Sequence, residues 1–232
     1  MTRQIVLDTE TTGISPKQGH RIIEIGCIEL KNRVITGDHG HWYIHPDREI
    51  DAGAEKVHGI SLKSLEGKPR FAEIVDEFLD YIKGAELIIH NAPFDVGFID
   101  HELRLAGARY KDTAHYCTVL DTLVMARMKH PGQRNSLDAL CSRYAVDNSN
   151  REWHGALLDS ELLAQVYLFM SGGQTQMFAA EEGVQDAPVK VDIQRASGDR
   201  QPLPVVMPTP EEEQAHRQYV VALGEEAVDW AD

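Results

Sequence analysis

Short apolar runs alternate with segments of helical spacing over residues 1–170. Runs rich in Ile, Val and Leu predict strands, which we place at residues 4–8, 22–30, 40–44, 86–90 and 117–120. Apolar positions three and four apart predict helices, which we place at residues 71–83, 94–106, 122–129, 137–144 and 156–170. This alternation of strands and helices predicts an α/β fold for the first 170 residues.

The pattern changes after Met170. Ser171, Gly172 and Gly173 predict a hinge, and residues 179–210 are rich in Gln, Asp, Pro, Gly and Ser, which is typical of a mobile linker. Residues 211–223 predict one further helix, because acids occupy its first turn and Gly224 follows its end. We therefore expect a domain at residues 1–170 and a mostly flexible tail at 171–232.

Composition limits where the protein works and how it binds nucleic acid. The chain has 232 residues, 42% of them hydrophobic, and its three scattered cysteines are typical of a reducing compartment. No signal-peptide core follows Met1 and no apolar run is long enough for a membrane span, so we expect a cytoplasmic protein. The net charge of −14 argues against a broad basic face that grips duplex DNA.

Two carboxylates follow the first buried strand. Asp8 and Glu10 come directly after Ile5, Val6 and Leu7, and side chains two residues apart in a strand point to the same side. Such a pair repels itself and loses hydration unless a cation compensates. Oxygen ligands favour Mg²⁺ or Mn²⁺, so the pair predicts a divalent-metal site, although a surface ion pair would give the same two residues.

Three further residues extend this candidate site. Asp95 falls in the first turn of a predicted helix, directly after a strand, where a carboxylate is favoured. His154 and Asp159 are five residues apart, about 140° out of register on a helix, so we place His154 on the loop before the helix and Asp159 in its first turn. Paired cations with a neutral imidazole suit phosphodiester hydrolysis, in which His154 would take a proton from water.

These residues carry a resemblance to a known family. Asp8-x-Glu10, Asp95 and His154-x-x-x-x-Asp159 resemble the three exonuclease motifs of the DEDD superfamily, in its histidine-containing branch. The surrounding sequence is similar to the proofreading (epsilon) subunits of bacterial DNA polymerase III at residues 6–13, 21–26, 57–60, 85–98, 135–141, 154–159 and 172–175. The resemblance implies a ribonuclease-H-like fold, with a five-stranded mixed sheet whose second strand is antiparallel.

The resemblance also implies an activity and roles for individual residues. The activity would be 3′→5′ hydrolysis that releases nucleoside 5′-monophosphates, with two divalent cations, Mg²⁺ or Mn²⁺, as cofactors. His154 would be the general base. Asp8, Glu10, Asp95 and Asp159 would bind the metals, and Thr9, Thr11, Gly13, His58 and Phe94 would line the pocket for the terminal nucleotide. On spacing alone, a loop hydrogen bond is as good an explanation for His58.

The tail offers two candidate docking segments. Residues 174–178 are similar to the bacterial sliding-clamp-binding motif, with Gln174 followed by the anchors Met177 and Phe178, although these side chains could instead fold back on the preceding helix. The helix at 211–223 with Trp230 resembles the region through which this family binds the DNA polymerase III α subunit. The expected partners are therefore a single-stranded or frayed 3′ DNA end, the α subunit and the clamp.

Two other functions remain open at this point. A stand-alone exoribonuclease that trims RNA 3′ ends would use the same chemistry, although the long tail argues against it. A non-catalytic adaptor that bridges the clamp and the polymerase is disfavoured by the complete set of acids. Neither reading involves a membrane.

Overall fold

The computed structural model describes residues 2–149, 153–172 and 209–223. The chain divides into two compact units, residues 1–182 and 183–232. The predicted domain boundary at 170/171 stays a prediction, and the expected docking residues Gln174, Met177, Phe178 and Trp230 lie outside the described residues.

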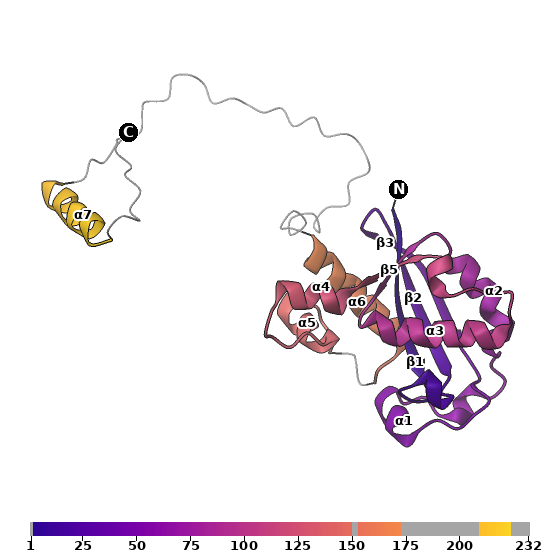
Figure 1. Ribbon diagram of the computed structural model, residues 1–232. Helices are drawn as coiled ribbons and strands as arrows, with labels where there is room; N and C mark the ends of the chain where they lie inside the picture. Colours follow the sequence, from indigo (N-terminus) through magenta and orange to yellow (C-terminus); the bar gives the residue numbers. More distant parts are fainter. Residues whose placement is uncertain (1, 150–152, 173–208, 224–232) are drawn as a thin grey trace. The chain divides into compact units, whose positions relative to one another are not determined.

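A five-stranded mixed sheet forms the centre of the first unit (Figure 1). Its order is β3-β2-β1-β4-β5, in which β2 is antiparallel to both neighbours and β1, β4 and β5 are parallel. The strands are β1 (Arg3–Thr11), β2 (Ile22–Lys31), β3 (Val34–Tyr43), β4 (Glu86–Ile89) and β5 (Thr118–Asp121). The predicted five-stranded mixed sheet with an antiparallel second strand is confirmed.

Six α-helices of the first unit are described. They are α1 (Ala52–His58), α2 (Phe71–Ile82), α3 (Ala92–Ala106), α4 (Thr122–Lys129), α5 (Leu137–Tyr144) and α6 (Ala156–Ser171). All but α1 match the helices predicted from the sequence to within two residues at each end. Helix α7 (Pro210–Leu223) belongs to the second unit and begins with a capping box, in which Glu212 Oε2 accepts from the Thr209 amide at 2.8 Å.

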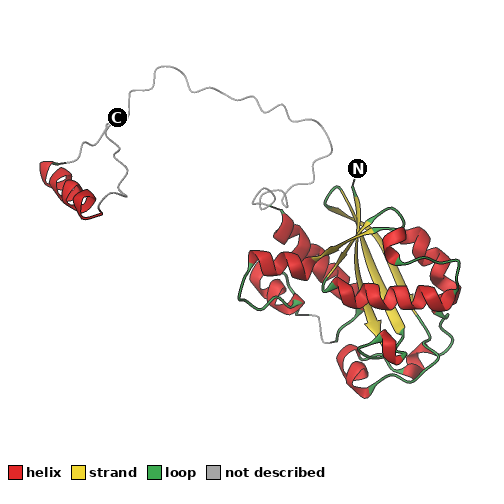
Figure 2. Cartoon of the chain, viewed as in Figure 1, coloured by secondary structure: helices red, strands yellow, loops and turns green. Residues whose placement is uncertain are grey.

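Helices cover both faces of the sheet (Figure 2), and the side chains of β1 alternate between them. Ile5 and Leu7 pack with the apolar side chains of α2 and α3 on one face. Val6, on the opposite face, packs with Leu163 and Tyr167 of α6. Helices α4 and α5 then pack against α6 in a third cluster. Any side chain of β1 therefore faces either α3 or α6 according to its position in the alternation.

Strand β3 begins six residues earlier than the sequence predicts. Its first six residues are exposed, and only the first two, Val34 and Ile35, are large apolar residues, so they carry no alternating apolar pattern. The β2–β3 connection is a two-residue turn at Asn32 and Arg33, which have φ of 51° and 67°. A primed turn needs such positive values, and the usual glycine signal for it is missing here. The early part of β3 is thus held by pairing with β2 rather than by burial of its own side chains.

Candidate active site

The carboxylates of Asp8 and Glu10 project from the free end of β1. Pairing between β1 and β4 stops at Val6 and Ile88, so both acids lie beyond the last β4 partner. Val6 faces α6, and alternation therefore turns Asp8 and Glu10 towards α6 as well. Both side chains are intermediate in exposure, at an edge of the sheet that solvent reaches.

The first turn of α6 comes unusually close to β2, next to this pair. A Cβ at Gly26, the residue paired with Asp8, would lie 2.3 Å from the backbone of Ala156, so only glycine permits this approach. The buried carboxylate of Glu24 accepts the Ala156 amide through Oε2 at 3.1 Å, and its Oε1 lies 2.7 Å from His41 Nε2. A carboxylate at a helix N-terminus is favourable, so Glu24 fixes the start of α6.

Helix α6 and the loop before it carry Asp159 and His154. Asp159 lies in the first turn and is 4% exposed, whereas His154 lies in the loop and Gly155 is the N-cap. His154 Nδ1 is 3.4 Å from Asp159 Oδ2, and the His154 amide donates to the Val57 carbonyl at 3.2 Å. The loop position of His154 and the helical position of Asp159 are those that their spacing predicts.

Glu10, His154 and Asp159 form the candidate metal centre. One ligand atom of each lies within 4.8 Å of the others, although the three residues come from β1, the loop and α6. The two carboxylates are hard oxygen donors that suit Mg²⁺ or Mn²⁺, and the imidazole is a borderline donor beside them, so these residues fit the metal that the motifs imply. Asp8 lines the same cavity as His154 and Asp159, on the α6 side of the sheet.

Asp95 reaches the site from the opposite helical layer. Thr9 alternates with Asp8 and so faces α3, where its hydroxyl donates to Asp95 Oδ1 at 2.6 Å. Asp95 is 3% exposed in the first turn of α3, and burial raises the pKa of its carboxyl to about 7 even though the Thr9 hydroxyl acts to lower it. Asp95 is not part of the three-residue group and contacts β1 through Thr9.

Two cavities flank the candidate centre. The larger cavity, about 760 Å³, has Asp8, His154 and Asp159 in its wall. Arg127, an exposed residue of α4, also lines it. The smaller, about 360 Å³, has Glu10 in its wall. Four of the five predicted nucleotide-binding residues line this smaller cavity, and Thr9 does not; the four are Thr11, Gly13, His58 and Phe94.

His58 lines the smaller cavity with a largely buried ring. Its Nδ1 accepts the Ile60 amide at 3.0 Å, which leaves the ring hydrogen on Nε2. The residue is 5% exposed, and its buried Nε2 makes no hydrogen bond of ordinary geometry among the described residues, although the Thr11 backbone lies close enough to act to raise the pKa of the ring. Burial lowers the pKa of His58, so the neutral ring offers one donor, at Nε2. A buried donor without a partner is costly unless a ligand satisfies it.

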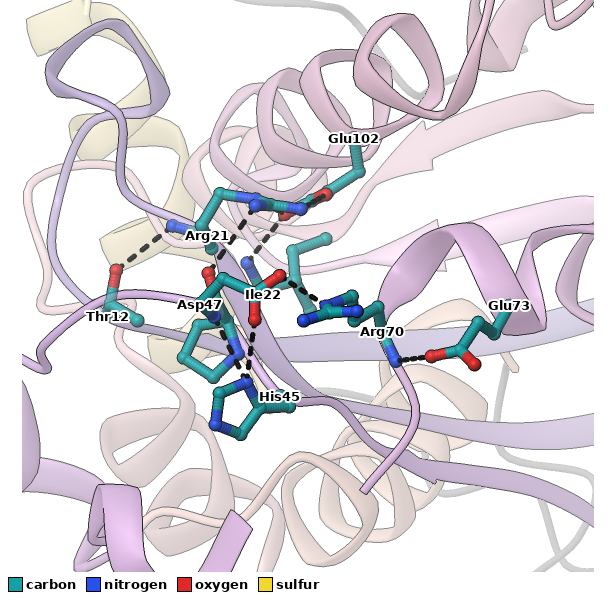
Figure 3. Close-up of polar contacts among 9 residues, drawn as sticks. Thr12, Arg21, Ile22, His45, Asp47, Arg70, Glu73 and Glu102 are labelled. Carbon is teal, nitrogen blue, oxygen red and sulfur yellow. Dashed lines mark hydrogen bonds and ion pairs between the residues drawn. The ribbon is translucent and has the colours of Figure 1, made fainter. Parts of the chain in front are cut away.

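The ion pair between Arg21 and Glu102 fixes the start of β2 (Figure 3). Arg21 donates from Nε and Nη2 to the two oxygens of Glu102 at 2.7 and 2.6 Å, and Glu102 Oε1 also accepts the Ile22 amide. The Arg21 amide in turn donates to Thr12 Oγ1 at 3.0 Å. Glu102 thereby connects α3, through Arg21, to the turn that follows Thr11. Gly13 in this turn lines the smaller cavity.

Sequence reasoning missed α1 and the residues around it. Helix α1 has seven residues and supplies Val57 and His58 to the smaller cavity, yet its short sequence has no clear apolar stripe. Gly59, with φ of 70°, ends the helix and was the one available signal for it. Trp153 and Arg127 also border the site, and their spacing alone carries no sign of it.

Comparison with known proteins defines first a class of enzyme. The family model described as Exonuclease matches residues 5–167. Exonuclease X in complex with 5′ overhanging duplex DNA superposes with a TM-score of 0.57 at 22% identity, over 72% of this chain and 90% of that one. The nuclease domain of 3′hExo, a DEDDh family member bound to rAMP, gives 0.62 at 18% identity, over 73% and 91%. At these identities the two structures show a shared fold.

Closer relatives narrow the class. DNA polymerase III subunit epsilon of Escherichia coli K12 is 53% identical over 221 residues, which cover 93% of this chain and 91% of the relative. The subunit of Haemophilus influenzae is 52% identical over 229 residues, covering 94% and 89%, and that of Rickettsia prowazekii is 48% identical over 222 residues, covering 94% and 95%. The chain belongs to the exonuclease family, among the epsilon subunits of DNA polymerase III, and is a nuclease of the metal-dependent type.

Among the described residues, no helix combines the length and the apolar character needed to cross a bilayer.

Proposed function

We propose that this exonuclease removes mispaired 3′-terminal nucleotides from DNA as a subunit of DNA polymerase III, releasing 5′-monophosphates. The observation that carries the proposal is the convergence of Glu10, His154 and Asp159 between two cavities, in a chain half identical to named epsilon subunits. The smaller cavity would hold the terminal nucleotide, and the larger cavity would hold the nucleotides that precede it.

The metal site is proposed to hold two divalent cations, Mg²⁺ or Mn²⁺. Asp8, Glu10 and Asp159 supply oxygen ligands from β1 and α6, and Asp95 contributes from α3. When bound, the cations neutralise charge at phosphorus and favour the ionised form of the attacking water. The close grouping of the acids supports this role, since like charges so near each other need cationic compensation.

His154 is proposed as the general base. Nδ1 faces Asp159 Oδ2 at 3.4 Å, so the carboxylate favours a hydrogen on Nδ1, and Nε2 would accept a proton from water. The side chain is 46% exposed, so it can pass that proton to solvent after each cycle. Asp159 would thus have two roles, as a metal ligand and as the carboxylate that faces the imidazole.

The smaller cavity is proposed to hold the terminal nucleotide. His58 Nε2 would donate to an oxygen of that nucleotide, and Thr11, Gly13 and Phe94 would surround it, while Thr9 acts indirectly by holding Asp95. Phe94 offers an aromatic surface against which a base can stack, and its own ring is supported by Phe98 at 5.0 Å. In the larger cavity, Arg127 would contact a backbone phosphate.

A frayed end is the substrate that this arrangement favours. A mismatched terminal base costs little to unstack, so it enters a separate pocket more readily than a paired base. The net charge of −14 gives little affinity for free DNA, and attachment to the polymerase would compensate by raising the local concentration of the 3′ end. We propose that Trp230 contacts the α subunit and that Gln174, Met177 and Phe178 contact the sliding clamp, in the cytoplasm.

The nuclease assignment is tested with a 5′-labelled primer whose 3′ end is mismatched on its template. The wild type should shorten this primer with Mg²⁺ and should stop when EDTA is added. Asp8→Ala should remove the activity and leave binding to the α subunit intact. An Asp8→Ala protein that digests the primer at the wild-type rate contradicts the assignment. An RNA primer of the same sequence, cut as fast as the DNA, would favour an exoribonuclease instead.

The tail assignments are tested separately by gel filtration of the full chain with each partner. Met177→Ala combined with Phe178→Ala should release the clamp and retain the α subunit. Trp230→Ala should weaken binding of the α subunit and retain the clamp. Each variant is the other's control, and neither should alter digestion of a free single strand. If both variants bind both partners as the wild type does, these docking residues are wrong.

A further inference from the structure

The loop that carries His154 contacts the end of α1. A Cβ built at Gly59 would lie 3.0 Å from Cδ2 of Trp153, so the indole packs directly on the Gly59 backbone. The neighbouring His154 amide donates to the Val57 carbonyl at 3.2 Å. Trp153 and His154 are therefore joined to α1 by a side-chain contact and a backbone hydrogen bond, at consecutive residues.

Gly59 suits this contact in two ways. Its φ of 70° is the left-handed conformation that ends α1, which a residue with a Cβ adopts only with strain. Its missing side chain also leaves the space that the indole occupies. Trp153 is 55% exposed, which is unusual for so large an apolar side chain. The part of the indole that is buried packs against Gly59.

The other end of the loop is held by the sheet. Glu24 accepts the Ala156 amide, and the Asp159 amide donates to the Gly155 carbonyl at 2.8 Å. His154 lies between this attachment and the one at Trp153. Its ring is largely in solvent, where the 3.4 Å contact with Asp159 is too long to fix the imidazole by itself. Attachment of the backbone on both sides therefore limits where the ring can lie.

We infer that Trp153 is a positioning residue, which holds the His154 backbone against the end of α1 so that the imidazole stays in place for proton transfer. This inference rests on the proposed role of His154 as the general base. Helix α1 also supplies Val57 and His58 to the smaller cavity, so one short helix positions both the nucleotide pocket and the base. Small displacements of a catalytic group lower the rate more than they lower binding.

The test compares Trp153→Ala, Trp153→Phe and the control Phe169→Ala in the full chain. Phe169 is 53% exposed near the far end of α6, so its removal matches the loss of exposed aromatic surface away from the site. With a single-stranded oligonucleotide and Mn²⁺, Trp153→Ala should lower kcat about tenfold and leave KM within about twofold. Trp153→Phe should recover most of kcat, and Phe169→Ala should behave as the wild type.

A second measurement does not depend on activity. The His154 amide is protected from hydrogen exchange by the Val57 carbonyl, so NMR should show faster exchange at this amide in Trp153→Ala and no change in Phe169→Ala. Unchanged exchange and unchanged kcat in Trp153→Ala would overturn the inference, as would a loss of kcat that Trp153→Phe does not recover. His154→Ala separates the two proposals, because activity in that variant would contradict the general base itself and leave the packing of Trp153 untouched.

Discussion

Two sets of buried carboxylates in this domain differ in how their charge is compensated. Glu102 and Glu29, each 1% exposed, lie against arginine or lysine at 2.6 to 2.8 Å. Asp159, 4% exposed, lies 3.4 Å from the exposed His154. Asp95, 3% exposed, accepts a hydrogen bond from the Thr9 hydroxyl. The first set is paired with fixed cationic side chains, whereas the second lies against a histidine and a hydroxyl, and Asp159 belongs to a group that fits a divalent cation.

This difference separates structural acids from catalytic acids without reference to motifs. Burial disfavours the charged form of any carboxylate, and a fixed guanidinium removes that penalty permanently. A carboxylate that must bind and release cations is better served by a neutral or titratable neighbour, such as Thr9 beside Asp95 or His154 beside Asp159. Removing a charge from the two sets should therefore have opposite consequences: lost activity with a retained fold for the second set, and lost stability with a retained mechanism for the first.

The largest expected effect is on activity. Asp159→Asn keeps the side-chain volume and removes the charge, so exonuclease kcat should fall by at least about 10³-fold. The melting temperature without metal should stay the same or rise, because repulsion with Glu10 is relieved. Addition of Mn²⁺ should raise the melting temperature of the wild type and not that of the variant, measured by calorimetry. A strongly destabilised but active Asp159→Asn would place this residue in the structural set.

Glu102→Gln tests the opposite side of the comparison. Arg21 would lose both charged contacts, and the Ile22 amide would keep only a weaker acceptor. Breaking a buried pair in this way costs about 3 kcal/mol, which corresponds to a fall in melting temperature of roughly 6–12 °C. Measured well below that temperature, kcat should stay within a few-fold of the wild type. A loss of activity with unchanged urea denaturation would instead make Glu102 part of the catalytic machinery.

Glu29 adds a dependence on pH. Burial acts to raise the pKa of its carboxyl, but hydrogen bonds from Lys31, Arg3 and Thr36 outweigh it and lower the pKa to about 2. Because the folded pKa lies below the unfolded value near 4.5, this stabilisation is complete above that value and disappears as the pH falls towards 2. We allow about 2 kcal/mol for it at pH 7, since Lys31 is half exposed and its contribution is screened by solvent.

Urea denaturation at several pH values checks this expectation. Glu29→Gln should be less stable than the wild type at pH 7, and the two curves should converge between about pH 4.5 and pH 2. Catalytic activity at neutral pH should be unaffected, because β2 and β3 hold Glu29 away from both cavities. A stability difference that persists unchanged at pH 2 would show that packing, and not charge, explains the loss.

The same contrast explains how much the sequence could predict. Asp8, Glu10 and Asp159 are fixed by local rules, namely strand alternation and the position of a helix start, so a linear pattern is enough to find them. The contacts of Glu24 with Ala156 and of Trp153 with Gly59 join segments far apart in the chain, and no local rule predicts them. The early part of β3 was missed because pairing rather than burial holds it, and α1 because seven residues are too few for a periodic signal.

The smallest expected effect comes from Asp47, an acid that lies as close to an arginine as Glu102 does but is much more exposed. Asp47 Oδ2 lies 2.5 Å from Arg70 Nε, and that contact lowers the pKa of Asp47 (Figure 3). The two side chains are 41% and 63% exposed, so water already solvates both charges and salt screens them. Asp47→Asn should therefore shift the melting temperature by less than about 2 °C, and less still in 1 M salt. A shift as large as that of Glu102→Gln would show that the short distance, and not burial, decides which carboxylates stabilise this fold.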